Sequence, residues 1–136
     1  MKKAKTILRW LCVLPVAILV GQLCFLVAML INSYSLYQTS QGNLKYYLVA
    51  SIGTILANGI GGYCYIIFGS KVAPSLKYKV SLLLFALLDL LCVFSLCVLW
   101  FSDNDYDCAL HSFAILSMIG SAYWATKKVK VKNGNV

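Results

Sequence analysis

Four long apolar segments dominate this sequence and restrict what the chain can fold into. Each is about 20 residues long, the length that an α-helix needs to cross the hydrocarbon core of a bilayer. Lipid offers no hydrogen-bond partners to the peptide backbone, so the segments are predicted to be helices. The expected fold class is all-α, a single-domain bundle of four transmembrane helices within residues 1–136. The predicted spans are residues 10–31, 46–69, 80–101 and 108–126.

The composition argues against a soluble protein. Hydrophobic residues make up 61% of the chain and charged residues 12%, whereas soluble domains are about 45–50% apolar and about 25% charged. A globule of 136 residues has too little interior to bury so much apolar surface. We therefore expect the lipid bilayer as the main partner, and no nucleic-acid partner despite the net charge of +8.

The positions of the basic residues predict the orientation. Eleven of the twelve Lys and Arg residues lie in residues 2–9, 71–79 and 127–132, and the twelfth is Lys45. Cytoplasmic loops carry an excess of Lys and Arg, so both termini and the loop between the second and third spans are expected in the cytoplasm. The expected location is the cytoplasmic (inner) membrane, crossed several times. Anionic lipid head groups are expected partners of the basic termini. The external loops are then residues 32–45 and 102–107.

Each predicted span has a polar residue near its middle, roughly 12–18 Å into the bilayer. Successive helices run in opposite directions, so the four depths coincide near the midplane. A shared polar layer is expected, because each group would otherwise face lipid without a hydrogen-bond partner. The candidate layer consists of Gln22, Asn58, Asp89 and Ser117.

Asp89 is the acidic member of this layer. An ionised carboxylate at that depth costs at least about 2.5–3.5 kcal/mol on insertion scales, so the side chain should face the bundle interior. No Lys or Arg lies inside a predicted span, and we expect a protonated acid that donates a hydrogen bond. Two interpretations remain open: structural hydrogen bonds to Asn58 or Gln22, or a relay for protons or cations.

Small residues recur at three- and four-residue spacing in the second and fourth spans. Such faces let helix backbones approach closely, whereas the alternative is a glycine-broken helix that lines a substrate path, as in transporters. The partner of this face is either a neighbouring helix or another copy of the chain. The predicted packing residues are Gly53, Ala57, Gly61, Ser117, Ser121 and Ala125.

Two stretches, residues 8–17 and 68–77, resemble small four-span inner-membrane proteins of bacteria to which no activity is assigned. The resemblance implies a location in the membrane and no particular chemistry. Small multidrug transporters share the size and the number of spans, but their acidic residue lies in the first helix. Here the first span has Gln22, and Asp89 lies in the third.

Motifs for catalysis or for cofactor binding are not evident in the sequence. The six cysteines show neither C-x-x-C nor a zinc-ligand spacing with histidine, and we predict no catalytic residues, no metal site and no cofactor. The expected function is that of a non-enzymatic structural or accessory membrane protein, either a homo-oligomer or a partner of another membrane protein. The alternatives are a small proton-coupled transporter or channel that uses Asp89, and a holin or immunity-type protein of a phage or plasmid.

Overall fold

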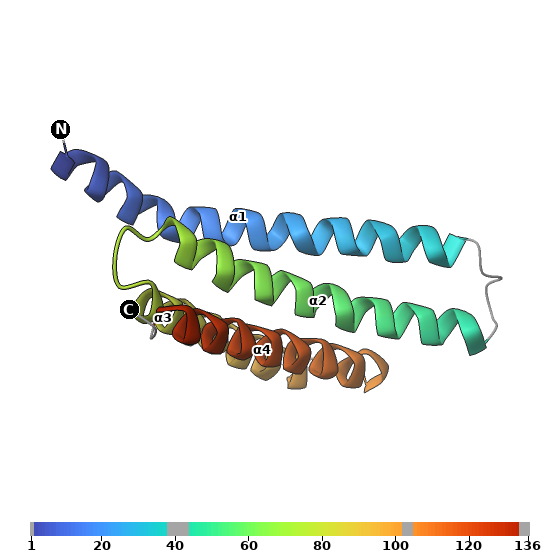
Figure 1. Cartoon of the computed structure of the whole chain (residues 1–136). Helices are drawn as coiled ribbons and strands as arrows, with labels where there is room; N and C mark the ends of the chain where they lie inside the picture. Colours follow the sequence, from blue (N-terminus) through green and yellow to red (C-terminus); the bar gives the residue numbers. More distant parts are fainter. Residues whose placement is uncertain (1, 38–43, 102–104, 134–136) are drawn as a thin grey trace.

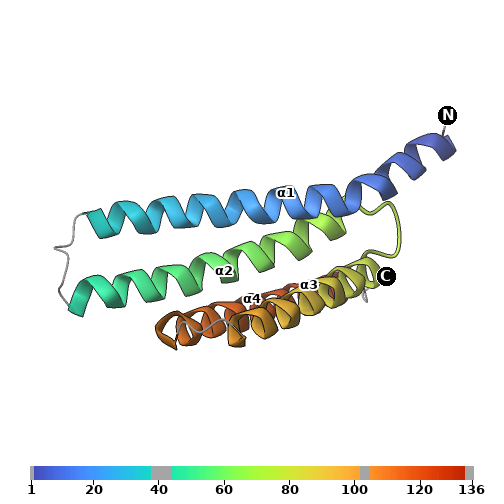
Figure 2. The same ribbon diagram turned by 180° about the vertical axis from the view of Figure 1, so that it is seen from behind.

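The computed structural model of the chain describes residues 2–37, 44–101 and 105–133. Four helices account for nearly all of these residues: α1 (Lys2–Tyr37), α2 (Leu44–Val72), α3 (Lys77–Trp100) and α4 (Asp105–Asn133). The helices lie alongside one another, and each runs antiparallel to the next in the chain (Figure 1, Figure 2). The all-α prediction is therefore confirmed.

Three of the four helices are long and apolar enough to cross a membrane. They are residues Thr6–Tyr37 of α1 and the whole of α2 and α3. Within the residues described, α4 does not reach the same hydropathy, because polar residues such as His111 and Ser121 interrupt its apolar stretch. The predicted fourth span thus forms a helix, and three spans are supported by length and composition.

The helices extend beyond most ends of the predicted spans. α1 continues to Tyr37, so Asn32, expected in a loop, is helical and buried, with its amide against Gly53 of α2. A helix needs apolar side chains only where it faces lipid, and hydropathy alone therefore underestimates its length. Of the loops expected at residues 32–45 and 102–107, residues 32–37, 44–45 and 105–107 are helical. The remaining residues, 38–43 and 102–104, lie outside the described part of the chain.

Helix α2 is the central helix of the bundle. It packs against α1 on one side and against α4 and α3 on the other, and α3 and α4 also pack together. In the most apolar stretch of α2, 39% of the residues are buried, against 17% in each of α1 and α3. Side chains such as Leu19 of α1 and Leu90 of α3 are 68% and 67% exposed, as expected where a helix faces lipid.

One end of the bundle carries the N-terminal end of α1, the C-terminal end of α4 and the turn at residues 73–76 (Figure 1). We call it the basic end. Pro74 disfavours helical geometry at Ala73 and so terminates α2. Leu76 then adopts the left-handed conformation, with φ 52° and ψ 39°, and its carbonyl accepts a bond from the Val80 backbone N–H at 3.0 Å.

The N-terminal part of α1 bends away from α2 (Figure 1). Pro15 lies inside α1, where it removes one backbone hydrogen bond and crowds the preceding turn. A bend of this kind is the usual effect of a proline within a helix.

Candidate functional site

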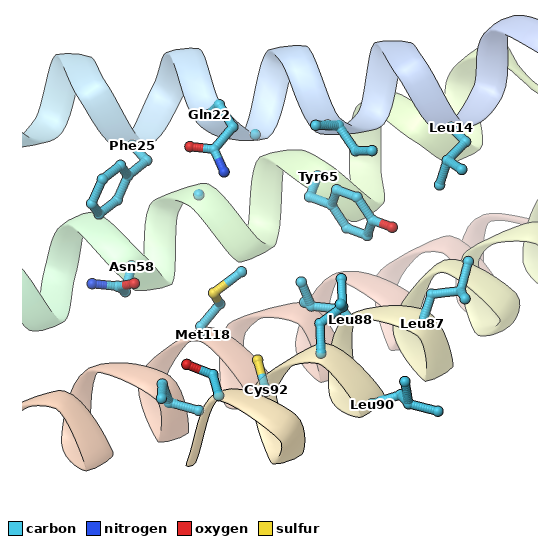
Figure 3. A pocket seen from close by; sticks show the side chains of 16 residues that line it. Leu14, Gln22, Phe25, Asn58, Tyr65, Leu87, Leu88, Leu90, Cys92 and Met118 are labelled. Atoms are coloured by element: carbon cyan, nitrogen blue, oxygen red, sulfur yellow. The ribbon is translucent and has the colours of Figure 1, made fainter. Parts of the chain in front are cut away.

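A groove of about 580 Å³ lies between α1 and α3, over the surface of α2. We call it the central groove. Side chains of α1, α2 and α3 line it, together with Ile115 and Met118 of α4 (Figure 3). Most of the lining is apolar, and the polar side chains that reach it are those of Gln22, Asn58, Tyr65 and Ser95.

The groove exists because α1 packs along α2 and makes little contact with α3. Gly21 and Gly61 allow this close approach: a Cβ atom on Gly61 would lie 3.3 Å from the Cβ of Phe25 and 3.4 Å from the carbonyl oxygen of Gly21. On its two sides the groove is bordered by exposed side chains, Ile18 from α1 and Leu91 from α3. It is therefore open toward the surroundings of the bundle.

The polar groups of the groove have unused hydrogen-bonding capacity. Asn58 donates from Nδ2 to the Thr54 carbonyl at 2.9 Å within α2. The Oδ1 atom of the same side-chain amide remains available as an acceptor. Within the described residues, neither the Gln22 amide nor the Tyr65 hydroxyl makes a hydrogen bond. Gln22 comes from α1, while Asn58 and Tyr65 come from α2 (Figure 3).

The four residues of the predicted polar layer do not form one hydrogen-bonded cluster. Gln22 and Asn58 share the central groove. Ser117 instead joins α4 to α2 by donating from its hydroxyl to the carbonyl of Ile55 at 3.0 Å. Asp89 does not line the groove, and in the described part of the chain it makes no hydrogen bond to Asn58 or Gln22.

The position of Asp89 follows from the geometry of α3. Leu84, Leu88 and Cys92 form the buried stripe of this helix. Asp89 and Phe85 are one turn apart and share the face of α3 next to this stripe. The Phe85 ring contacts the Tyr123 ring of α4, with centroids 6.3 Å apart. The carboxyl group is therefore on the α4 side of α3, away from α1.

The small residues lie on two different faces of α2. Gly53 and Gly61 face α1, where they contact Asn32 and Gly21. Ser117 and Ser121 of α4 instead lie against the other face of α2, close to Gly59 and Gly62. Ala57 and Ala125 are fully buried. The contacts that the structure shows for these faces are thus with neighbouring helices of the same chain.

Sequence reasoning missed Tyr65 as a residue of the site. It is only 7% exposed, yet its side chain lines the central groove. A signal was present, because Tyr65 lies four residues after Gly61 and therefore on the same face of α2. A tyrosine within an apolar span attracts less notice than a carboxylate or an amide.

Among the described residues, no three His, Cys, Asp or Glu side chains lie close enough together to hold a metal ion. The described cysteines are free thiols, and those of Cys24 in α1 and Cys64 in α2 contact each other. No protein-family model, curated protein or solved structure matches this chain. The central groove is therefore the basis for an assignment of function.

Proposed function

We propose that this chain is a non-enzymatic accessory protein of the bacterial cytoplasmic membrane that binds a transmembrane helix of a partner protein in the central groove. One observation carries the proposal: the groove is open and mostly apolar, but it presents polar groups with unused hydrogen-bonding capacity. An occupant of matching chemistry has an apolar surface and at least one polar side chain.

Lipid meets only the first of these requirements. An acyl chain can fill an apolar groove, but it offers no partner to Gln22 or Tyr65, and unpaired polar groups are unfavourable in hydrocarbon. A transmembrane helix with a polar side chain at this depth meets both requirements, and hydrogen bonds between such helices contribute about 0.6–1.7 kcal/mol each. A helical partner is therefore preferred over lipid.

The proposal includes four membrane crossings with both termini in the cytoplasm. α4 packs along α2 and α3 and has a buried stripe that includes Ala114, Ala122 and Ala125, which supports its assignment as the fourth span. Eleven of the twelve basic residues belong to the termini and to the stretch from 71 to 79. Because these parts gather at the basic end, the basic end is assigned to the cytoplasm.

Photo-crosslinking in native membranes tests the assignment of the groove. A photoreactive amino acid replaces Ile18, which lines the groove, and in the control it replaces Leu19, which is 68% exposed and does not line it. We expect a protein adduct from position 18 and only lipid adducts from position 19. Gln22→Leu should lower the yield at position 18 about three- to fifteenfold, the equivalent of one interhelical hydrogen bond.

Two results would contradict the proposal. Lipid adducts alone at position 18 would mean that the groove holds lipid. An adduct of two copies of this chain, identified by its mass, would mean that the groove mediates self-association and not the binding of a different protein.

The main alternative, a proton-coupled transporter or channel, needs Asp89 on the substrate path. Asp89 lies on the α4 side of α3 and does not line the central groove. This placement favours the accessory interpretation over the transporter, and the Asp89 variants described below test the two against each other.

A further inference from the structure

A second groove, of about 560 Å³, lies between α3 and α4 at the basic end. We call it the basic-end groove. α3 contributes three side chains and α4 five. The lining residues are Tyr78, Leu82, Phe85, Tyr123, Thr126, Lys127, Lys130 and Val131.

The polarity of the basic-end groove changes along its length. Lys130 lies beside Tyr78 near the start of α3, with Nζ 5.8 Å from the ring centroid. Phe85 is seven residues further along α3, about 10 Å deeper at the rise of an α-helix, and there it contacts Tyr123. One end of the groove is therefore cationic, and the other is aromatic and apolar.

This gradient matches the chemistry of a phospholipid. α3 begins at Lys77 and is one of the helices long and apolar enough to cross a membrane, so Lys130, beside Tyr78, lies at the level of the head groups. Lys127 lies one turn deeper on α4, and its long exposed side chain reaches toward the same level. Leu82 and Phe85 lie at the level of the acyl chains. No acidic side chain lines the groove among the described residues, and the charge there favours an anion.

We propose that the basic-end groove binds one anionic phospholipid of the cytoplasmic leaflet. Lys127 and Lys130 contact its phosphate, and an acyl chain packs along Leu82 and Phe85. Thr126 also lines the groove, but its hydroxyl already donates to the carbonyl of Ala122 at 3.0 Å. The contacts to the phosphate therefore come from the two lysines. The site is separate from the central groove and does not depend on what that groove binds, but its assignment to the cytoplasmic leaflet rests on the orientation proposed above.

Lipid binding by the full-length protein in non-ionic detergent tests this site. The protein is titrated with phosphatidylglycerol or phosphatidylcholine, and bound lipid is counted by native mass spectrometry. We expect one retained phosphatidylglycerol. The double variant Lys127→Gln with Lys130→Gln should bind it roughly 25-fold more weakly, because each lysine near anionic lipid contributes about fivefold.

The control removes the same amount of charge at the same end of the bundle. Lys71→Gln with Lys132→Gln changes two exposed lysines that do not line the groove, and this variant should bind phosphatidylglycerol like the wild type. Glycerol phosphate, a head group without acyl chains, should not displace the bound lipid. Matching thermal stability of both double variants in detergent without added lipid would show that each is folded.

Several outcomes would overturn the proposal. Equal losses in the two double variants would indicate diffuse attraction to the basic end. Equal retention of phosphatidylcholine would remove the requirement for an anion, and displacement by glycerol phosphate would mean that the site takes a phosphate without a lipid. Failure of the wild type to retain phosphatidylglycerol would mean that the basic-end groove does not bind this lipid.

Discussion

Asp89 is the only acidic residue inside a predicted span, and its surroundings decide between a structural role and a relay. One interpretation of the sequence was a structural role through hydrogen bonds to Asn58 or Gln22. In the described part of the chain these bonds are absent, and Cys92, one turn further along α3, lies near the carboxyl group. Asp89 makes no hydrogen bond to another described residue and therefore stabilises the bundle little, whereas an aspartate at this depth costs about 2.5–3.5 kcal/mol on insertion scales.

Substitution of Asp89 should therefore not weaken the fold. Asp89→Leu removes the insertion cost and no hydrogen bond between described residues, so we expect this variant to accumulate in membranes at least as well as the wild type. Asp89→Asn should behave similarly, because it keeps the shape of the side chain and removes only the titrating proton. The measurements are accumulation in membranes and thermal stability in detergent.

The two variants also separate the proposed functions. Loss of the Asp89→Leu protein from the membrane, together with normal accumulation of Asp89→Asn, would demonstrate a hydrogen bond of Asp89 that the described residues do not show. A folded Asp89→Asn protein without the wild-type growth or flux phenotype would favour the transporter. Under the accessory interpretation, both variants keep the phenotype.

At the scale of the helices, the glycines of α2 determine which neighbours it has. Gly53 and Gly61 admit α1, and Gly59 and Gly62 admit α4. The contact with α4 is the less adjustable of the two, because a Cβ atom on Gly53 would meet the movable side chain of Asn32 on the α1 side. A Cβ atom on Gly62 would lie 2.7 Å from the carbonyl oxygen of Met118, a backbone atom that cannot move without the helix.

Gly62→Ala should therefore destabilise the bundle, by about 1–3 kcal/mol, the usual cost of overpacking a close contact. Gly120→Ala in α4 is the matched control, because a Cβ atom there meets nothing within 4 Å. Alanine in a helix interior is more favourable than glycine by about 0.5–1 kcal/mol, so the control should be neutral or stabilised. Thermal unfolding in detergent compares the two, and equal melting temperatures would refute the close packing of α2 and α4.

The sequence was sufficient to predict the helices but not their boundaries or their contacts. Length and hydropathy identified four helices because only a helix satisfies its backbone in lipid. The same criteria placed Asn32 in a loop, since they cannot detect a helix that continues past the apolar region. The spacing of small residues identified Gly53 and Gly61 as close-contact residues, but it did not show that Ser117 and Ser121 pack on a different face of α2.

At the scale of the whole molecule, the arrangement of the helices creates both grooves. α1 is joined to the bundle through α2, which leaves the central groove open between α1 and α3. This order could not be predicted from the sequence, because a helix with one side toward lipid and the other toward its neighbours is apolar all round. Leu87 and Leu88 show the difficulty, since one is 40% exposed and the other 5%.

The central claim is that all four helices cross the membrane and that both termini lie in the cytoplasm. The location of a reporter fused after Val136 tests it most directly, with a fusion after Pro74 as the reference. The positive-inside rule predicts a cytoplasmic reading for both fusions. An external reading after Val136, with a cytoplasmic reading after Pro74, would mean that α4 does not cross the membrane, and would contradict the account.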